Sequence, residues 1–367
     1  MMSGKVRIGV IGASSRPHGW AARAHLPAIA ASEDVELAAV CTTRRESAEE
    51  SARKFGAELA FDDYREMLAR EDIEAVSVVV RVPSHHQVAK DALLAGKPVY
   101  TEWPLGRTTE EAVELAELAA ERGIVTAVGL QARVHPAYRY VRDLIADGHI
   151  GEVLSCRAST VTSGALAKRT DFAWSAAADT GANTLTVTNG HTLDTVVFLL
   201  GGAVRTLSAQ TTTQVKQWHS IDADEYVDVD APDTVIVTGT LTGGATFSSY
   251  ASMVPFAGEG FRIEVYGRKG TLTIQGDYHP QNSDPVLRVA LGTNALKPLE
   301  VPAQYVTVPR VTETIQPYGV GVAYHEFARS IRGEEGAAPD FAVAVTLHRL
   351  LDAIRQSSAS GAVVTLG

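Results

Sequence analysis

The segment Val6-Arg7-Ile8-Gly9-Val10-Ile11-Gly12, close to the start of the chain, decides the fold class. Its apolar run predicts a strand over residues 5–11 that is buried on both faces, as strands of parallel sheets are. The loop after it leads into a segment, residues 20–32, whose pattern predicts a helix. A buried strand, a glycine-containing loop and a helix form the opening unit of a doubly wound α/β fold.

The same alternation continues through the first third of the chain. Helices are predicted at residues 45–55, 85–95 and 109–122, and further strands at residues 36–41, 75–80, 98–101 and 124–130. Strands that alternate with helices form parallel sheets. We therefore predict an N-terminal doubly wound domain over residues 1–130.

The pattern changes after residue 131, where strands follow one another without helices between them. After helices at 136–147 and 189–200, strands are predicted at 206–212, 234–240, 246–252, 262–266 and 271–275, with a hairpin turn at 267–270. This predicts an α+β domain with an antiparallel sheet over residues 131–367. A helix at about 341–357 is expected to pack back on the body of the protein.

Composition excludes several classes of function. The formal net charge of −10 argues against a nucleic-acid partner and against an anionic membrane surface. No apolar run is long enough to span a bilayer and no signal peptide is recognisable, so a cytoplasmic location is expected. The acidic stretch 222–230 lacks the spaced ligands and the glycine of a calcium loop, so no metal site is predicted.

The loop after the first strand is a candidate site for a dinucleotide. Pyrophosphate binding needs close approach of the backbone and a helix N-terminus directed at the phosphates, and Gly12 and Gly19 can supply these. The spacing is longer than G-x-G-x-x-G, and Ser14 stands where a second glycine is expected. Ser15 and Trp20 complete this candidate site. The alternative is an ordinary strand-to-helix loop.

The end of the second strand distinguishes NAD from NADP. NAD enzymes place a carboxylate there to bind the ribose 2′-hydroxyl, but here the strand is followed by Thr42, Thr43, Arg44 and Arg45. Two hydroxyls and two guanidinium groups suit a 2′-phosphate, and an anion would offset the unfavourable placement of cations at a helix N-terminus. NADP is favoured over NAD. In the alternative, both arginines are solvated and balanced by Glu49 and Glu50.

Several segments occur in an order that is typical of one family. They are Val82-Pro83-Ser84-His85, Ala95-Gly96-Lys97-Pro98-Val99, Glu102-Trp103-Pro104-Leu105, Gly190-His191-Thr192-Leu193-Asp194 and Tyr266-Gly267-Arg268-Lys269-Gly270-Thr271-Leu272. They resemble the glucose–fructose oxidoreductase / inositol dehydrogenase / MocA family (Gfo/Idh/MocA). The run Gly-Trp-Ala before Ala24-His25-Leu26-Pro27, together with Glu102-Trp103, is most similar to the branch that contains the yeast galactose-pathway co-repressor.

The resemblance implies a Rossmann domain followed by a large open antiparallel sheet. It implies a sugar or cyclitol substrate that lies between the sheet and the nicotinamide. It also implies a homodimer or homotetramer, because the free face of the sheet commonly packs against a partner subunit in the family.

The catalytic pattern of the family is broken at two positions. The family lysine is replaced by Trp103, whose indole cannot relay a proton, and the family aspartate is replaced by Val187. Only His191 remains, and its residue type suits proton transfer near neutral pH. Asp194 lies one helical turn farther along and is expected to orient the imidazole. The alternative is a structural His191–Asp194 pair.

Other candidates come from the remaining motif positions. Val82, His85, Glu102 and Trp103 are expected at the cofactor, although a surface role for His85 remains open. Gln131 and Arg133 face the cleft in the family, although an interdomain ion pair is an equal alternative for Arg133. Trp103, Trp174 and His191 complete the expected substrate contacts, with a core position as the alternative for Trp174.

Two hypotheses follow from these residues. In the first, the chain is an NAD(P)-dependent oxidoreductase that acts on a sugar, a sugar derivative or a cyclitol, with His191 as the acid/base. In the second, it is a non-catalytic NAD(P)-binding sensor that contacts another protein.

Overall fold

The computed structural model describes residues 4–309 and 315–367 and divides into two compact units. Unit 1 contains Met1–Val134 and Thr307–Thr346, and unit 2 contains His135–Val306 and Leu347–Gly367. This division differs from a single boundary at residue 130, because the segment Thr307–Thr346 packs with the N-terminal half. The long helix α9 (Phe341–Ser360) begins in unit 1 and ends in unit 2.

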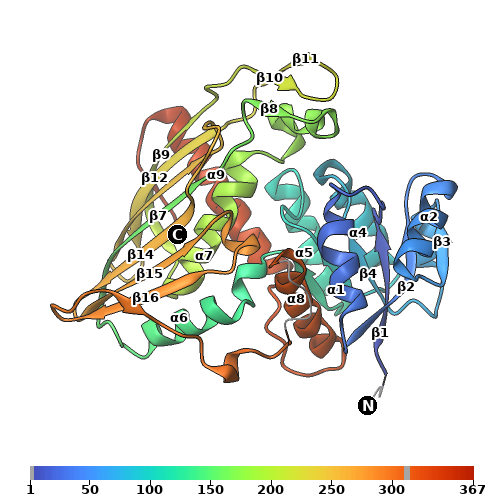
Figure 1. Ribbon diagram of the computed structural model, residues 1–367, viewed down its shortest axis with the longest axis horizontal. Helices are drawn as coiled ribbons and strands as arrows, with labels where there is room; N and C mark the ends of the chain where they lie inside the picture. The colour runs from blue at the N-terminus through green and yellow to red at the C-terminus, as the bar shows by residue number, and fades with distance from the viewer. Residues whose placement is uncertain (1–3, 310–314) are drawn as a thin grey trace. The chain divides into compact units, whose positions relative to one another are not determined.

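Unit 1 is built on a six-stranded sheet with the order β3-β2-β1-β4-β5-β6 (Figure 1). The strands are β1 (Val6–Ile11), β2 (Val35–Cys41), β3 (Leu59–Phe61), β4 (Ala75–Val78), β5 (Val99–Thr101) and β6 (Thr126–Val128). Every pairing in this sheet is parallel. The predicted doubly wound Rossmann sheet is therefore confirmed, in the strand order that is typical of dinucleotide-binding folds.

The helices of unit 1 begin and end for local reasons. α5 (Thr109–Arg122) begins where the Thr108 side chain accepts a hydrogen bond from Glu111 N, and it ends at Gly123, whose φ is 63°. The helix expected over 20–32 is divided into a π-helix, η1 (Ala21–His25), and a short α-helix, α1 (Leu26–Ala30). The other helices of this half are α2 (Arg45–Phe55), α3 (Tyr64–Leu68), η2 (Val82–Ser84), α4 (His85–Leu94) and η3 (Gln131–Arg133).

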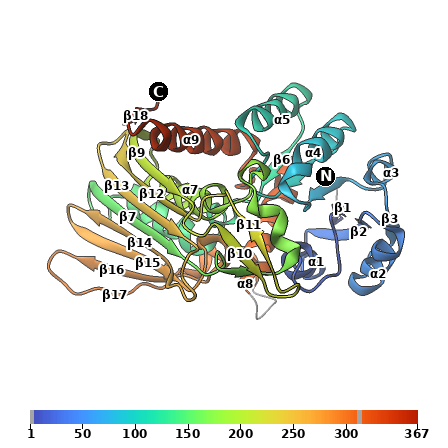
Figure 2. The ribbon, with the colours of Figure 1, turned by 90° about the horizontal axis from the view of Figure 1, so that it is seen from above.

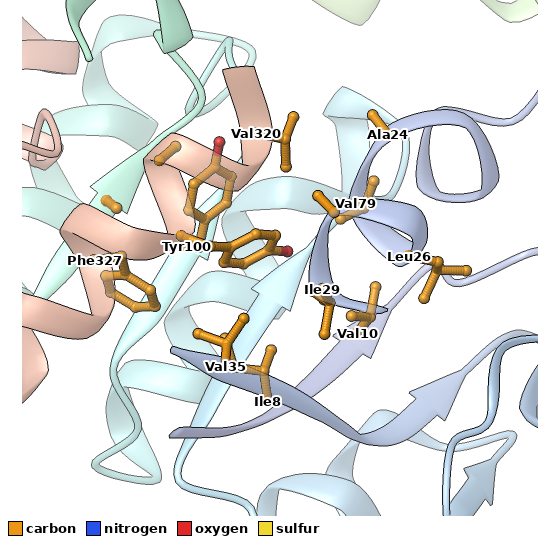
Figure 3. Close-up of a cluster of buried hydrophobic side chains, with 14 of the residues drawn as sticks. Ile8, Val10, Ala24, Leu26, Ile29, Val35, Val79, Tyr100, Val320 and Phe327 are labelled. Atoms are coloured by element: carbon orange, nitrogen blue, oxygen red, sulfur yellow. The ribbon is translucent and has the colours of Figure 1, made fainter. Parts of the chain in front are cut away.

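Helix α8 (Ile315–Ile331) was not predicted from the sequence, and it completes the core of unit 1. Its side chains Val320 and Phe327 lie in one buried cluster with Tyr100 of β5 and Ile8 of β1 (Figure 3). Burial of a large apolar side chain of this kind contributes about 2 kcal/mol. The cluster explains why the segment Thr307–Thr346 belongs to unit 1.

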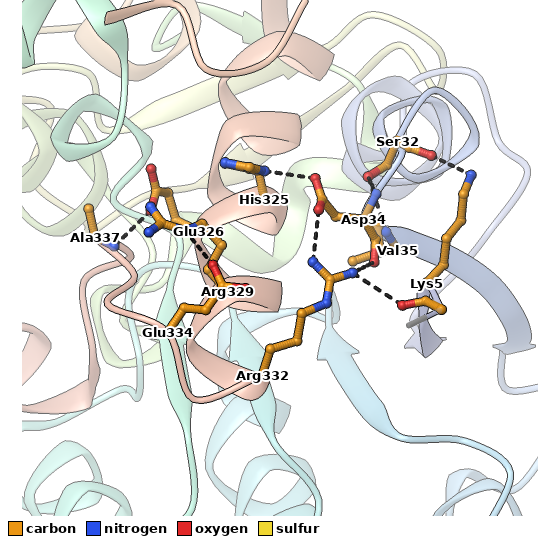
Figure 4. A network of polar contacts seen from close by, with 11 residues as sticks. Lys5, Ser32, Asp34, Val35, His325, Glu326, Arg329, Arg332, Glu334 and Ala337 are labelled. Carbon is orange, nitrogen blue, oxygen red and sulfur yellow. Dashed lines mark hydrogen bonds and ion pairs between the residues drawn. The ribbon is translucent and has the colours of Figure 1, made fainter. Parts of the chain in front are cut away.

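Polar contacts also attach α8 to unit 1 (Figure 4). The carboxylate of Asp34, directly before β2, accepts hydrogen bonds from His325 Nδ1 at 2.7 Å and Arg332 Nη1 at 2.9 Å. Burial raises the pKa of Asp34, but these two partners outweigh burial and the net shift of the pKa is downward. This is a carboxylate–histidine pair at the amino end of the parallel sheet.

Unit 2 is built on a nine-stranded sheet with the order β17-β16-β15-β14-β7-β13-β12-β9-β18 (Figure 2). The strands are β7 (Val153–Val161), β9 (Val204–Thr212), β12 (Thr234–Leu241), β13 (Thr246–Ser252), β14 (Gly260–Gly267), β15 (Gly270–Gly276), β16 (Val286–Leu291), β17 (Lys297–Pro298) and β18 (Val364–Thr365). The predicted α+β domain with a large sheet is confirmed. The sheet is mixed rather than purely antiparallel, because the central strand β7, which the sequence did not indicate, pairs in parallel with β13.

A second, three-stranded sheet in unit 2 has the order β11-β10-β8. Its strands are β8 (Ala167–Lys168), β10 (Gln217–Ser220) and β11 (Glu225–Asp228). The acidic stretch 222–230 therefore contains a strand of a hairpin, β11, which pairs with β10. Trp218 of β10 is buried, and the Lys168 ammonium lies 3.6 Å from the centroid of its ring.

Three longer helices belong wholly or partly to unit 2: α6 (Pro136–Ala146), α7 (Gly190–Leu200) and the C-terminal part of α9. The side chains of Ser357 and Ser358 in α9 accept hydrogen bonds from the backbone of β9, at Ala209 N and Thr211 N. No helix within the described residues is both long and apolar enough to cross a membrane. Both cysteines, Cys41 and Cys156, are free and buried, and burial raises the pKa of each thiol to about 12.

Candidate cofactor and active-site residues

The turn after β1 requires glycine at position 12. Gly12 has a φ of 91°, and a Cβ at this position would lie 2.3 Å from the carbonyl oxygen of Val79 at the end of β4. The backbone N–H groups of Gly12 and Ala13 both donate to the Cys41 carbonyl. The chain therefore passes very close to its neighbouring strands here and leaves the carboxyl edge of the sheet clear of side-chain bulk.

The rest of the loop carries polar groups with different roles. Ser15 is buried, and its hydroxyl donates to Glu50 Oε1 at 2.8 Å, so this side chain anchors the loop to α2. The Ser14 hydroxyl accepts only a long hydrogen bond, 3.4 Å, from Arg16 N. Gly19 N donates to Arg16 O, which turns the chain into η1. The buried indole Nε1 of Trp20 has no hydrogen-bond partner among the residues that the structure describes.

These observations fit a bound dinucleotide. A close backbone turn, a helical segment that starts directly after it and a buried unsatisfied N–H donor are the features that a pyrophosphate-containing ligand uses. No carboxylate follows β2. The Thr42 hydroxyl donates to Arg44 O at 2.9 Å and contacts the Ser47 hydroxyl, whereas Thr43 and Arg44 are exposed.

The two arginines after β2 have different environments. Arg45 Nε donates to Glu49 Oε1 at 3.0 Å, four residues along α2. Within the described part of the chain, the Arg44 guanidinium has no hydrogen-bond or ion-pair partner. In the alternative interpretation, Glu49 and Glu50 balance the charges of both arginines. The structure shows this for Arg45, which binds Glu49, but not for Arg44, because Glu50 binds Ser15.

His85 joins two loops at the carboxyl edge of the sheet. Its imidazole is buried, with Nδ1 2.7 Å from the Pro104 carbonyl oxygen and Nε2 3.0 Å from the Val80 carbonyl oxygen. Burial lowers the pKa of this histidine. Val82, at the start of η2, is buried beside it. His85 is thus not a surface residue, and it fixes the loops that carry Val82 and Trp103.

Glu102 lies directly after β5, and its carboxylate contacts the side chains of His25 and Gln131 in unit 1. Its Oε1 lies 2.9 Å from His25 Nε2, and Gln131 Nε2 donates to Oε1 at 3.1 Å. A Cβ at Gly129 would lie 2.7 Å from Glu102 Oε2, so the carboxylate occupies the space that a side chain at 129 would need. Trp103 follows with 5% exposure and a cis peptide bond to Pro104.

No role was predicted for His25, although it lies within the Ala24-His25-Leu26-Pro27 run that indicated the family branch. Its imidazole is fully buried, and Nδ1 lies 2.6 Å from the Tyr324 hydroxyl. Tyr324 in turn donates to Ser77 Oγ at 2.8 Å. The network therefore joins η1, α8, β4 and the end of β5, and no short-range sequence pattern could have indicated it.

In unit 2, His191 lies in the first turn of α7. This helix follows a π-helix, η6 (Thr184–Asn189), whose start is fixed by a capping box between Asn183 and Thr186. π-Helical turns are frequent at functional sites. Val187, at the position of the family aspartate, lies within this π-helix.

The imidazole of His191 is buried beside a second histidine that the sequence analysis missed, His279. Burial, and then the proximity of His279, lowers the pKa of His191 to about 3, and burial lowers the pKa of His279 to about 4. Thr162 Oγ1 lies 3.3 Å from His279 Nε2, and the Tyr278 ring stacks on the His279 ring at 4.3 Å. Asp194 is buried one turn along α7. An ionised Asp194 carboxylate bound to the imidazole would raise the pKa of His191, whereas the pKa of His191 is lowered.

The remaining candidate substrate residues are distributed between the units. Gln131 is buried in η3 and belongs to the Glu102 network, and Arg133 in the same turn is half-buried. Trp174 is half-buried in η4 (Thr170–Ala176) of unit 2. No group of three or more histidine, cysteine, aspartate or glutamate side chains suited to a metal ion occurs among the described residues.

Comparison with known proteins agrees with this arrangement. Residues 6–130 match the family described as "Oxidoreductase family, NAD-binding Rossmann fold" (GFO_IDH_MocA), and residues 136–276 match "Gal80p, C-terminal domain". The chain belongs to the Gfo/Idh/MocA family and has a Gal80p-like C-terminal domain.

Relatives in this family include both enzymes and regulators. The chain is 27% identical to dehydrogenase aclE of Aspergillus oryzae, over 98% of each chain. It is 24% identical to the galactose/lactose metabolism regulatory protein GAL80 of Saccharomyces cerevisiae, over 74% of this chain and 67% of that protein.

Solved structures show the same fold. An NAD-binding oxidoreductase from Klebsiella pneumoniae has a TM-score of 0.86 at 26% identity, over 99% of each chain. Levoglucosan dehydrogenase in complex with NADH and levoglucosan has a TM-score of 0.86 at 22% identity, over 98% of this chain and 99% of that chain. At that identity, the second likeness concerns the fold alone.

Proposed function

We propose that this protein is an NAD(P)-dependent oxidoreductase that transfers hydride to or from a sugar, a sugar derivative or a cyclitol. The observation that carries the proposal is the set of groups at the carboxyl edge of the parallel sheet. Gly12, the Trp20 indole N–H and the Glu102 network are the kinds of group that a dinucleotide-dependent site needs. The match to a dehydrogenase over nearly the whole chain supports an enzyme.

The residues of this chain would perform separate tasks in that reaction. When bound, the nicotinamide supplies the acceptor or donor of hydride. Gly12 would let the pyrophosphate approach the turn closely, and the loop to Gly19, with the Ser14 hydroxyl, would surround it. His191, which is neutral near pH 7 because its pKa is about 3, accepts a hydrogen bond from the substrate hydroxyl and orients it. Asp194 supports the helix that carries it.

We further propose that NADP is preferred over NAD. The guanidinium of Arg44 is exposed and has no partner among the residues that the structure describes, whereas Arg45 binds Glu49. Together with the hydroxyls of Thr42 and Thr43, Arg44 suits a 2′-phosphate. Arg44→Ala should weaken NADPH binding about tenfold and leave NADH binding within about twofold, by fluorescence titration. Arg45→Ala is the matched control. Equal affinity of the wild type for NADPH and NADH would contradict the preference.

A non-catalytic NAD(P)-binding regulator is the second candidate. Trp103 and Val187 at the family's lysine and aspartate positions favour it, as does the Gal80p-like C-terminal domain. A regulator would bind the cofactor without turning over a substrate and would contact another protein.

A homodimer or homotetramer is proposed through the outer face of the large sheet. Ile236 of β12 and Tyr250 of β13 are paired in register, and each is more than 40% exposed. Beside them the Arg157 and Arg262 guanidinium groups both bind Glu264. An Ile236→Lys, Tyr250→Lys variant should be smaller than the wild type in light scattering after gel filtration, whereas Leu94→Lys, an exposed change in unit 1, should not.

The decisive experiment is a titration with NADPH and NADH followed by a turnover screen over sugars and cyclitols. Turnover on any member of the panel, abolished by His191→Asn with the cofactor Kd retained, would support the enzyme. Tight cofactor binding without turnover across the panel would support the regulator.

A further inference from the structure

The family lysine is absent, and the residue that remains in its place cannot accept the proton that alcohol oxidation releases. Trp103 has only an N–H donor. The pKa of His191, about 3, makes its imidazole a weak base at neutral pH, far from the value that suits proton transfer there. An oxidation catalysed by this protein therefore needs a further acceptor.

The structure holds a histidine–carboxylate pair next to Trp103. Glu102 Oε1 and His25 Nε2 are 2.9 Å apart, and the side chain of Glu102 is 13% exposed while that of His25 is 0% exposed. Glu102 directly follows a strand at the carboxyl edge of the parallel sheet, which is the edge at which doubly wound folds bind their ligands.

Counting protons defines the state of this pair. The Tyr324 hydroxyl donates its one proton to Ser77, so it accepts from His25, and Nδ1 of His25 must carry hydrogen. His25 Nε2 and Glu102 then have a single proton between them. The side-chain amide of Gln131 donates to both carboxylate oxygens, at 3.1 and 3.3 Å, and keeps them oriented.

We propose that the Glu102–His25 pair accepts the hydroxyl proton of the substrate and thus performs the task of the missing lysine. In the oxidation direction, the pair first releases its shared proton to water from the exposed side of Glu102. The C–H bond then breaks and its hydride passes to NAD(P)⁺, the O–H bond breaks and its proton passes to the Glu102 carboxylate, and the C=O bond forms. The proton gained in this way again lies between Glu102 and His25 Nε2. This step rests on the proposed function.

The neighbours of the pair do not compete with it for the substrate proton. Tyr100 from β5 and Tyr324 from α8 face it, and burial raises the pKa of both phenols above the usual value. Burial lowers the pKa of His85 in α4, so His85 stays neutral. The charges of Glu102 and of Glu111 in α5 raise this pKa, but burial outweighs them. Gln131 from η3 and Trp20 beside η1 carry no titratable proton.

Unit 1 offers a matched control, because a second carboxylate–histidine pair lies at the other edge of the same sheet. Asp34 binds His325 at 2.7 Å and is also neutralised by Arg332, directly before β2. Asp34 has the same type of partner as Glu102 but does not lie at the carboxyl edge of the sheet. Asp34→Asn therefore shows the effect of losing any carboxylate–histidine contact, and Glu102→Gln shows the additional effect of losing the proposed proton acceptor.

The test compares Glu102→Gln, His25→Gln and Asp34→Asn over a pH series, with a substrate that the wild type oxidises. Glu102→Gln should lower kcat for oxidation about 100-fold and abolish the acidic limb of the pH profile, which is the fall of kcat at low pH. His25→Gln should move that limb. Asp34→Asn should leave kcat and the limb as in the wild type.

A second readout does not need turnover. In protein labelled with ¹⁵N-histidine, the Nε2 resonance of His25 should move in Glu102→Gln and remain in place in Asp34→Asn. If the wild type oxidises a substrate and Glu102→Gln retains kcat within about threefold, or if Nε2 does not move, the pair is structural and the inference is wrong. Absence of turnover by the wild type would instead overturn the proposed function.

Discussion

Each unit contains a pair of side chains built around a buried histidine, and the two pairs are opposites. His25 in unit 1 has a partner on both ring nitrogens, Tyr324 and Glu102. Within the described residues, the imidazole of His191 in unit 2 has no hydrogen-bond partner, and its nearest titratable neighbour is another histidine, His279. One histidine faces a carboxylate, and the other faces a second histidine.

The difference teaches that burial alone does not decide what a histidine does. Burial disfavours the charged imidazole of His191, and the second histidine beside it adds to this effect, whereas the neighbour of His25 is a carboxylate. His191 is therefore suited to accept a hydrogen bond from a neutral ligand. His25 is suited to bind the Glu102 carboxylate.

The largest expected effect is on folding stability. His25→Leu, which preserves volume, should lower the free energy of unfolding by about 3 kcal/mol, because the Glu102 carboxylate and the Tyr324 hydroxyl each lose one hydrogen bond and face an apolar side chain instead. His191→Leu should lower it by less than about 1 kcal/mol at pH 7.5, because its ring has no hydrogen bond to lose. Urea titration measures both. If the two variants lost the same free energy of unfolding, the hydrogen bonds of His25 would not stabilise the protein more than the surroundings of His191 do.

The next effect concerns acid. The folded-state pKa values of His191 and His279, about 3 and about 4, lie below the ordinary value of 6.5, so the unfolded chain binds more protons below pH 6.5. Stability from these two groups is present above that pH and falls as pH decreases toward the folded values, by about 2 kcal/mol per histidine between pH 7 and pH 5.

Replacing either histidine should therefore flatten the pH dependence. His279→Gln keeps an amide near Thr162 and should lose about 2 kcal/mol less than the wild type between pH 7 and pH 5 in urea titrations. Replacement of an exposed histidine, His18→Gln, is the control and should leave the slope as it is. An unchanged slope in His279→Gln would mean that this histidine is not buried in its neutral form.

The sequence predicted the architecture well because the relevant signals are local. Valine-rich strands such as 75–80 and the capped helix over 109–122 each carry their own pattern. It did not predict α8, where Gly319 and Gly321 weaken the helical pattern, or the central strand β7. The segment Thr307–Thr346 belongs to unit 1 because its residues pack against residues about 300 positions earlier in the chain. A local sequence pattern cannot predict such packing.

The candidate site was predicted unevenly for the same reason. His191, Glu102 and the Gly12 loop lie in contiguous motifs that the family shares, so they could be singled out. His25, Tyr324 and His279 have roles only through contacts across long sequence separations. Glycines such as Gly129 gave no signal, because the sequence does not show which side chain fills the space beside them.

Gly129 allows the smallest and most specific test of the contrast between the pairs. The Cβ of Gly129→Ala would lie 2.7 Å from the flexible end of Glu102, so the carboxylate should move away from His25 while the backbone stays in place. We expect a loss of about tenfold in kcat for oxidation with little change in the urea midpoint, because only the geometry of the pair changes. Gly243→Ala, where nothing lies within 4 Å of the new Cβ, is the control. A variant with full activity would show that the reaction does not depend on where the Glu102 carboxylate lies, whereas a variant with a large loss of stability would show that the backbone and not the carboxylate had moved.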